Sequence, residues 1–562
     1  MRTPNFSASC AVICLLGHAA ARPKTHQVKD DHGAVASSVD VCSHIGVDLM
    51  RDGGNAADAM IGTVLCVGTI GMYHSGIGGG GFVLVRTPAG KYDFIDFRET
   101  APAGSSENMY ANHTELSISG GLASAIPGEL RGLEEIHKLY GSLPWHTLVW
   151  PSIKLARHGF IVGQDLAVYV GNAASYPFLD SDPAWALDFA PDGVRVKAGE
   201  RMYRRRYADT LEAVAKRGVD AFYHGPIANA TVQTLRRTGG IMTLEDLAKY
   251  EVLHRAPATL KYKGFKLTGC SAPSGGTVVG STLNIFSGFK ADFKGDAAGL
   301  TTHRLVEAMK YAYGQRGELG DPLFVPGMDE YQKSMLSAAA AAEIRSLISD
   351  SGVHNISAYD PKGLESLETP GTSHMVTADK SGLALTLTST INLIFGSTVM
   401  VPETGVIMNN EMNDFSIPGS SNAFGYIPSV ANYIRPGKRP LSSMSPSIVE
   451  NPDGTLHLAI GAAGGSRIIT ATIQNIIHIL DSGLSPYEAL ARPRLHDQLS
   501  PNTTSYEYGY DNATVAALTA RGHLPVWVAP GQSSAQGIRR LANGTFEAAG
   551  EPRQKDSGGV AY

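Results

Sequence analysis

A glycine–threonine pair at the head of a predicted strand constrains this chain more than any other feature. In PGTSHMVTADKSG, residues 370–382, Pro370 and Gly371 break regular structure, and a mainly apolar run typical of a strand follows. Thr372, Ser373 and His374 therefore stand where a loop meets a strand. Two interpretations are open at this point: a polar start of an ordinary strand, or a nucleophile still joined to the residue before it.

The second interpretation has a definite chemistry. A threonine can catalyse acyl transfer when its own backbone amine is free, because that amine can act as the base for the hydroxyl. An α-amine titrates near about 7.7 to 8.0, so part of it is neutral at physiological pH. The chain would have to be cut immediately before Thr372. Gly371 hinders attack on its carbonyl least, and residues 351–371, rich in Gly, Pro, Ser and Asp, form the best predicted linker.

Motifs for other chemistries are incomplete or absent in this chain. GIGGGG, residues 76–81, fits a dinucleotide-binding pattern, but a helix-like segment precedes it and a strand-like segment follows, which is the reverse of the required order. We interpret it as close backbone packing or a substrate-facing loop. The G-x-S-x-G and H-E-x-x-H motifs are absent. His374 shares a strand face with Thr372, and we expect a packing or hydrogen-bonding role for it.

Composition and the N-terminus indicate an exported globular protein. Of 562 residues, 43% are hydrophobic and 18% charged, with a net charge of -5, so a sizeable core is expected and a nucleic-acid partner is not. Arg2 and the apolar stretch 10–21 predict a signal peptide over residues 1–21. The apolar stretch is short for a membrane span, which needs about 20 residues. Secretion is therefore predicted, with a retained signal anchor at the cell surface or vacuole as the alternative.

Cysteines and glycosylation motifs agree with export. Cys42 and Cys66 lie on adjacent helix-like segments, where a disulfide is plausible, and Cys270 is left free and is expected to be buried. Six N-glycosylation sequons follow the predicted signal. They begin at Asn112, Asn229, Asn355, Asn502, Asn512 and Asn543.

Hydrophobic periodicity predicts sheets flanked by helices. We expect helical patterns to dominate from about 128 to 346. The other expected elements are helices over 36–54, 55–72 and 466–483, and hairpins over 82–99, 373–390 and 445–461.

Several ordered blocks together resemble the γ-glutamyltransferase (γ-glutamyltranspeptidase) family. They are DFRETAP, GTSHMVTADKSG, TSTINLIFGS, GVIMNNEMNDFS, RPLSSMSPSIV, GAAGGSRI and RPRLHDQL, and the resemblance runs from about residue 30 to 562. It implies an N-terminal-nucleophile hydrolase of the α+β class, a four-layer αββα sandwich that cuts itself between Gly371 and Thr372. A large subunit, 22–371 with its processing linker, and a small catalytic subunit, 372–562, would then build one core as a heterodimer.

The resemblance also assigns roles to residues. Thr372 would be the nucleophile, Thr390 its hydrogen-bonding partner, and Gly464 and Gly465 the backbone donors of the oxyanion hole. A γ-glutamyl group carries a carboxylate and an ammonium, so its pocket needs both signs of charge. Arg98, Ser442 and Ser443 would hold the carboxylate, and Asn392, Glu411 and Asp414 the ammonium.

The implied activity is cleavage of the γ-glutamyl bond of glutathione and its conjugates through a threonine acyl-enzyme. Glutamate would pass to water or to an acceptor amino acid or dipeptide, with no metal or organic cofactor. Ile394 and residues 419–439 depart from common family patterns, which leaves acceptor preference open. Two alternatives remain: a cephalosporin or glutaryl acylase of the same fold, and an unprocessed, inactive secreted homologue.

Overall fold

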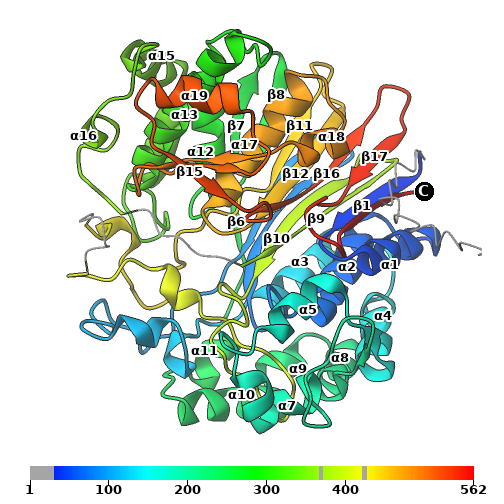
Figure 1. Ribbon diagram of the computed structural model, residues 1–562. Coiled ribbons are helices and arrows are strands. Elements are labelled where there is room, and N and C mark those ends of the chain that lie inside the picture. Colours follow the sequence, from blue (N-terminus) through cyan, green and yellow to red (C-terminus); the bar gives the residue numbers. More distant parts are fainter. Residues whose placement is uncertain (1–30, 366–370, 421–426) are drawn as a thin grey trace, which may run out of the picture.

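The computed structural model describes residues 31–365, 371–420 and 427–562 (Figure 1). The predicted signal, residues 1–21, lies outside these ranges. Two antiparallel sheets form the centre of the molecule. In the order of their neighbours, the strands of the seven-stranded sheet are β18 (Gly558–Ala561), β1 (Gly33–Ser37), β9 (Ser373–Asp379), β10 (Ala384–Thr390), β2 (Gly80–Arg86), β3 (Tyr92–Phe97) and β6 (Leu253–Arg255).

The second sheet has six strands and packs face to face on the first. Its order is β17 (Phe546–Ala549), β16 (Ser534–Arg540), β12 (Leu456–Ala463), β11 (Ser447–Glu450), β8 (Phe265–Gly269) and β7 (Ala258–Tyr262). β12 contacts β9 and β10 of the first sheet, and β16 contacts β1 and β9. The apolar faces of both sheets are thereby buried against each other.

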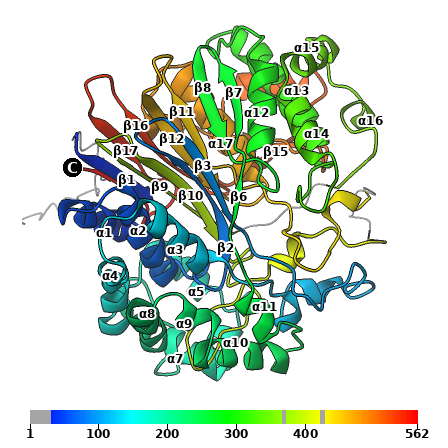
Figure 2. The same cartoon turned by 180° about the vertical axis from the view of Figure 1, so that it is seen from behind.

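Helices cover the two outer faces, as the views in Figures 1 and 2 show. On the seven-stranded sheet, α2 (Ala56–Ile70) contacts β1, β9 and β10, and α1 (Asp40–Arg51) packs beside it. On the six-stranded sheet, α17 (Arg467–Leu480) contacts β12, and α12 (Gly276–Phe286) contacts β7 and β8. The molecule is therefore a helix–sheet–sheet–helix stack of the predicted α+β class.

Further helices and short strands surround this stack. The helices are α3 (Glu129–Tyr140), α4 (Trp145–His158), α5 (Gln164–Gly171), α6 (Phe178–Ser181), α7 (Pro183–Phe189), α8 (Arg205–Arg217), α9 (Asp220–Tyr223), α10 (Pro226–Arg237), α11 (Leu244–Ala248), α13 (Ala297–Arg316), α14 (Met328–Met335), α15 (Ala338–Leu347), α16 (Ile356–Tyr359), α18 (Pro486–Ala491) and α19 (Asn512–Thr519). The strands are β4 (Phe160–Ile161), β5 (Arg201–Met202), β13 (Leu495–His496), β14 (Thr504–Glu507) and β15 (Pro525–Val528). In the part of the chain that is described, no helix is long and apolar enough to cross a bilayer.

Local sequence explains the elements nearest the site. All fifteen residues of α2 are buried, and Asn55 and Asp58 form a capping box at its start. The expected hairpins appear as β2–β3, β9–β10 and β11–β12, and the expected long helix as α17. Helices do not account for all of 128–346, because β6, β7 and β8 lie within 253–269 and extend both sheets. These strands are short and partly exposed, so their periodicity is weak.

Both sheets contain strands from the two sides of residue 371. In the seven-stranded sheet, β1 precedes that residue and pairs with β9 and β18, which follow it. β10 pairs with β2 in the same sheet, and β11 pairs with β8 in the other. Neither half of the chain contains a complete sheet, as predicted for one core shared by both halves.

The cysteines are arranged as expected. Cys42 of α1 and Cys66 of α2 form a disulfide, and Cys270 is free and buried. The asparagines of the six predicted sequons are all exposed, so a glycan at any of them would not have to enter the core. Glycosylation itself stays a prediction.

Candidate active site

Thr372 lies directly before β9, a central strand of the seven-stranded sheet. Its exposed fraction is 7%, and its φ of +91° falls in the left-handed region, which is unfavourable for a β-branched residue. Its hydroxyl donates a hydrogen bond to Oγ1 of Thr390, at 3.1 Å, at the end of the neighbouring strand β10. Thr390 Oγ1 also accepts from the backbone N–H of Asn392, at 2.8 Å. The predicted nucleophile and its predicted partner are thus in contact.

The carbonyl oxygen of Gly371, the residue before Thr372, already accepts a hydrogen bond. The backbone N–H of Gly464 donates to the carbonyl oxygen of Gly371, at 3.1 Å. A Cβ at Gly371 would lie 1.8 Å from the carbonyl oxygen of Asn392, so this position accepts only glycine. The carbonyl group at the predicted cleavage site is therefore hydrogen-bonded to Gly464, one of the two predicted oxyanion-hole donors.

Gly464 and Gly465 lie in the turn between β12 and α17. Their φ angles are +120° and +61°, and a Cβ at Gly464 would lie 2.6 Å from a backbone carbonyl oxygen. The backbone N–H of Gly465 has no hydrogen-bond partner within the described ranges. Both glycines therefore have a backbone geometry that suits the donor role implied by the family resemblance, and no described residue accepts from the second donor.

Arg98, which follows β3, contacts both predicted carboxylates. Its Nη1 pairs with Oε1 of Glu411 and its Nη2 with Oδ2 of Asp414, and Arg98 is completely buried. Glu99 adds a third carboxyl group, 3.8 Å from Nη1. Burial raises the pKa of Glu411 and of Asp414, and the guanidinium of Arg98 opposes this increase. The groups assigned to opposite charges of one ligand thus neutralise each other in this structure.

Asn392 connects the nucleophile to this charged group. Its N–H reaches Thr390, and its side-chain amide donates to the carbonyl oxygen of Asn410, at 3.0 Å, one residue before Glu411. Its φ of +70° is left-handed, which turns the chain between the two contacts. The structure therefore brings the nucleophile and the charged pocket into one connected network.

Ser442 and Ser443 lie on the segment whose Pro440 carbonyl oxygen accepts from Nε of Arg98, at 3.4 Å. Ser443 and Asp414 line a small cavity together with Arg316. Arg316 donates to Oγ of Ser443 at 3.1 Å. Sequence reasoning missed Arg316, because nothing at the end of a long helix marks it as a pocket residue.

His374 has the packing role expected for it. Its two ring nitrogens lie 2.8 Å from Oγ1 of Thr388 and 3.1 Å from Oγ1 of Thr386. Burial between the sheets lowers its pKa to about 3, so the ring is neutral at ordinary pH. GIGGGG is likewise a packing motif, because a Cβ at Gly79 would lie 1.9 Å from the carbonyl oxygen of Thr390.

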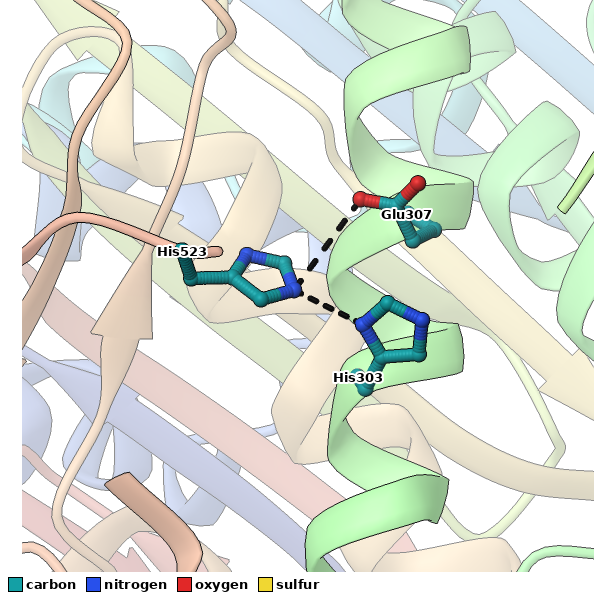
Figure 3. Close-up of side chains that lie close together, drawn as sticks. All are labelled: His303, Glu307 and His523. Atoms are coloured by element: carbon teal, nitrogen blue, oxygen red, sulfur yellow. Dashed lines mark hydrogen bonds and ion pairs between the residues drawn. The ribbon is translucent and has the colours of Figure 1, made fainter. Parts of the chain in front are cut away.

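One histidine cluster, shown in Figure 3, could not be predicted from spacing. Nδ1 of His303 lies 2.8 Å from Nε2 of His523, and Nε2 of His303 donates to the Ser349 carbonyl oxygen at 2.7 Å. Nδ1 of His303 therefore accepts the proton of His523. Lys310 Nζ lies 3.4 Å from both Glu307 and His523. These hydrogen bonds and the ammonium of Lys310 satisfy the cluster without a metal ion, and we assign no metal site to it.

Comparison with known proteins agrees with this geometry. The Gamma-glutamyltranspeptidase family model matches residues 42–561. The glutathione hydrolase proenzyme of Arthroderma benhamiae is 52% identical over 545 residues, covering 94% of this chain and 92% of that protein. The glutathione hydrolase of Aspergillus flavus is 49% identical over 532 residues, covering 94% and 89%.

A solved structure has the same overall arrangement. The cephalosporin acylase from Bacillus halodurans superimposes with a TM-score of 0.82 at 26% identity, covering 95% of this chain and 96% of that one. The match of the family model over most of the chain, the two relatives and the fold agree with one another. The chain belongs to the gamma-glutamyltranspeptidase family.

Proposed function

We propose that this protein cuts itself before Thr372 and then hydrolyses or transfers the γ-glutamyl group of glutathione and its conjugates. One observation carries the proposal. The carbonyl oxygen of Gly371 accepts from Gly464, while the hydroxyl of Thr372 is held by Thr390 at the same peptide bond. The word proenzyme in the name of the Arthroderma relative supports self-processing.

Self-processing would proceed as an N-to-O acyl shift. Oγ1 of Thr372 attacks the carbonyl carbon of Gly371, and the negative charge on the oxygen is stabilised by the N–H of Gly464. The C–N bond breaks, its nitrogen takes the hydroxyl proton, and an ester joins the two residues. Water then hydrolyses the ester, which leaves a carboxylate on Gly371 and restores the hydroxyl of Thr372. The left-handed φ of Thr372 stores strain that cleavage releases.

Turnover would use the groups that cleavage sets free. The new amine of Thr372 accepts the hydroxyl proton as Oγ1 attacks the γ-carbonyl of the donor, and the amine product leaves with that proton. The N–H groups of Gly464 and Gly465 stabilise the oxyanion, and one such donor contributes about 3 kcal/mol. Water then hydrolyses the ester and releases glutamate, or an acceptor amine attacks it and leaves with the γ-glutamyl group, and either step restores the hydroxyl of Thr372.

The charged pocket favours a zwitterionic head group. Arg98 would exchange a protein carboxylate for the α-carboxylate of the ligand, and Glu411 and Asp414 would exchange Arg98 for its α-ammonium. Asn392, Ser442 and Ser443 would complete these contacts. A glutaryl group lacks the ammonium and would leave two buried carboxylates with less compensation. This argues against the acylase alternative, which the fold of the Bacillus protein makes worth testing.

The proposal extends to assembly and location. We propose a heterodimer of residues 22–371 and 372–562, exported by the N-terminal signal and able to carry glycans at the exposed sequons. The disulfide between Cys42 and Cys66 supports an oxidising compartment. Acceptors would be amino acids, dipeptides or water.

The test begins with purified protein and γ-glutamyl-p-nitroanilide. We expect release of nitroaniline, two bands on a denaturing gel, and a small fragment whose first residues are Thr-Ser-His-Met. Thr372→Ala should remain one band without activity. Faster turnover of glutaryl-p-nitroanilide would support the acylase instead, and a single inactive band from the unmutated chain would support an inactive homologue.

A further inference from the structure

Arg316 is a second buried arginine beside the predicted carboxylate pocket. It is the last residue of α13, has an exposed fraction of 6%, and lines the small cavity that Ser443 and Asp414 also line. Arg98 is compensated by Glu411 and Asp414. Arg316 forms no such ion pair with any residue whose placement is described.

The hydrogen bonding of Arg316 is sparse for a buried guanidinium. Within the described ranges its one hydrogen bond goes to Oγ of Ser443, it has no ion pair, and its Nε has no partner. Buried Arg204, in contrast, donates to three backbone carbonyl oxygens. Burial lowers the pKa of Arg316, and the negative charge of Asp414 opposes that change. A buried cation with so few partners is costly unless a ligand supplies an anion.

The bond to Ser443 determines where the serine proton can go. Because Oγ of Ser443 accepts from Arg316, its own O–H must find another acceptor, and the residues of known placement supply none. A carboxylate in the cavity would accept that proton. It would also place its negative charge near the guanidinium of Arg316, which forms no ion pair with a residue of known placement although Glu365 lines the same cavity.

We propose that Arg316 is a positioning residue that orients the Ser443 hydroxyl toward the α-carboxylate of the donor and adds positive charge to that end of the pocket. The inference rests on the proposed function, because the carboxylate is that of the γ-glutamyl group. Arg98 and Arg316 would then both face the carboxylate of the ligand, while Glu411 and Asp414 would face its ammonium.

The test uses three p-nitroanilides that differ in one group each. γ-Glutamyl has both charges, glutaryl lacks the ammonium, and 4-aminobutyryl lacks the carboxylate. For Arg316→Gln we expect kcat/KM to fall about 10- to 100-fold, mainly through KM, on the first two substrates. On the third we expect less than about a threefold change. If turnover of the third is too slow to follow, the Ki of 4-aminobutyrate replaces it.

Two further variants separate positioning from folding. Arg204→Gln removes a buried guanidinium outside the pocket and should lower stability without this substrate pattern. Combining Arg316→Gln with Ser443→Ala should cost less than the sum of the two single losses, because the orienting part of the effect of Arg316 acts through Ser443. Equal losses on all three substrates, or additive losses in the double variant, would overturn the proposal. An inactive unmutated enzyme would instead refute the proposed function.

Discussion

Replacing Thr390 with valine removes a hydroxyl while keeping the side-chain shape. That hydroxyl oxygen accepts from the hydroxyl of Thr372, at 3.1 Å, and from the N–H of Asn392, at 2.8 Å. In the valine variant the nucleophile loses its orienting partner and a buried N–H loses its acceptor. Thr390→Ser keeps the oxygen and is the conservative comparison.

The expected magnitude follows from these two bonds. A neutral hydrogen bond contributes about 0.5 to 1.5 kcal/mol, and an orphaned buried N–H costs about 1 to 3 kcal/mol. If about 1.4 to 2.7 kcal/mol of this appears in the barrier to self-cleavage, Thr390→Val should slow processing about 10- to 100-fold. Thr390→Ser should stay within about threefold of the unmutated chain.

The assay follows conversion of freshly purified precursor into two bands over time. Thr388→Val is the matched control, because Thr388 lies on the same strand and bonds His374 instead of the nucleophile. It should lower thermal stability but not the processing rate. Processing of Thr390→Val at the unmutated rate, or equal slowing in all three variants, would refute the role assigned to Thr390.

Three further predictions concern other parts of the molecule. Gly371→Ala should stay uncut on a denaturing gel, because its Cβ would lie 1.8 Å from a carbonyl oxygen; processing at the normal rate would contradict the geometry. Burial raises the pKa of Glu129 to about 7. Between about pH 4.5 and 7 the unfolded chain loses this proton while the folded chain keeps it, so the free energy of unfolding should fall as the pH rises through this range. Thermal unfolding of Thr372→Ala precursor should show that decline, and Glu129→Gln should flatten it; an unchanged pH profile would count against this cause. Exchanging Cys42 and Cys66 for serine should lower the free energy of unfolding by about 3 to 4 kcal/mol in urea titrations, since their disulfide closes a loop across 24 positions; a loss below about 1 kcal/mol would disagree.

The parts of the site that are local in sequence could be predicted. Gly371 and Thr372 are neighbours, and the turn before them and the strand after them leave visible patterns. The hairpins and the disulfide also follow from nearby residues. Contacts between distant residues could not be derived from residue types alone. Arg98 and Glu411 are 313 positions apart, and only the family resemblance placed them in one pocket.

Other features left no pattern to find. The helix expected over 36–54 starts too early, because residues 36 and 37 end the strand β1 and α1 begins at Asp40; short buried strands and buried helix starts have similar compositions. Arg316 resembles an ordinary basic residue at a helix C-terminus, where its charge would be favourable anyway. Its burial, and the lack of an ion pair to it within the described ranges, follow from the packing of distant elements and leave no local pattern.

The pairing of strands from the two sides of residue 371 has a consequence for the processed enzyme. After cleavage, β1 would still be hydrogen-bonded to β9 and β18, β2 to β10, and β8 to β11. Pulling the two polypeptides apart would open ladders in both sheets and expose bare edges to water. Dilution should therefore not dissociate the two polypeptides, and different enzyme molecules should not exchange subunits. Both subunits of each active heterodimer would therefore come from the same precursor molecule.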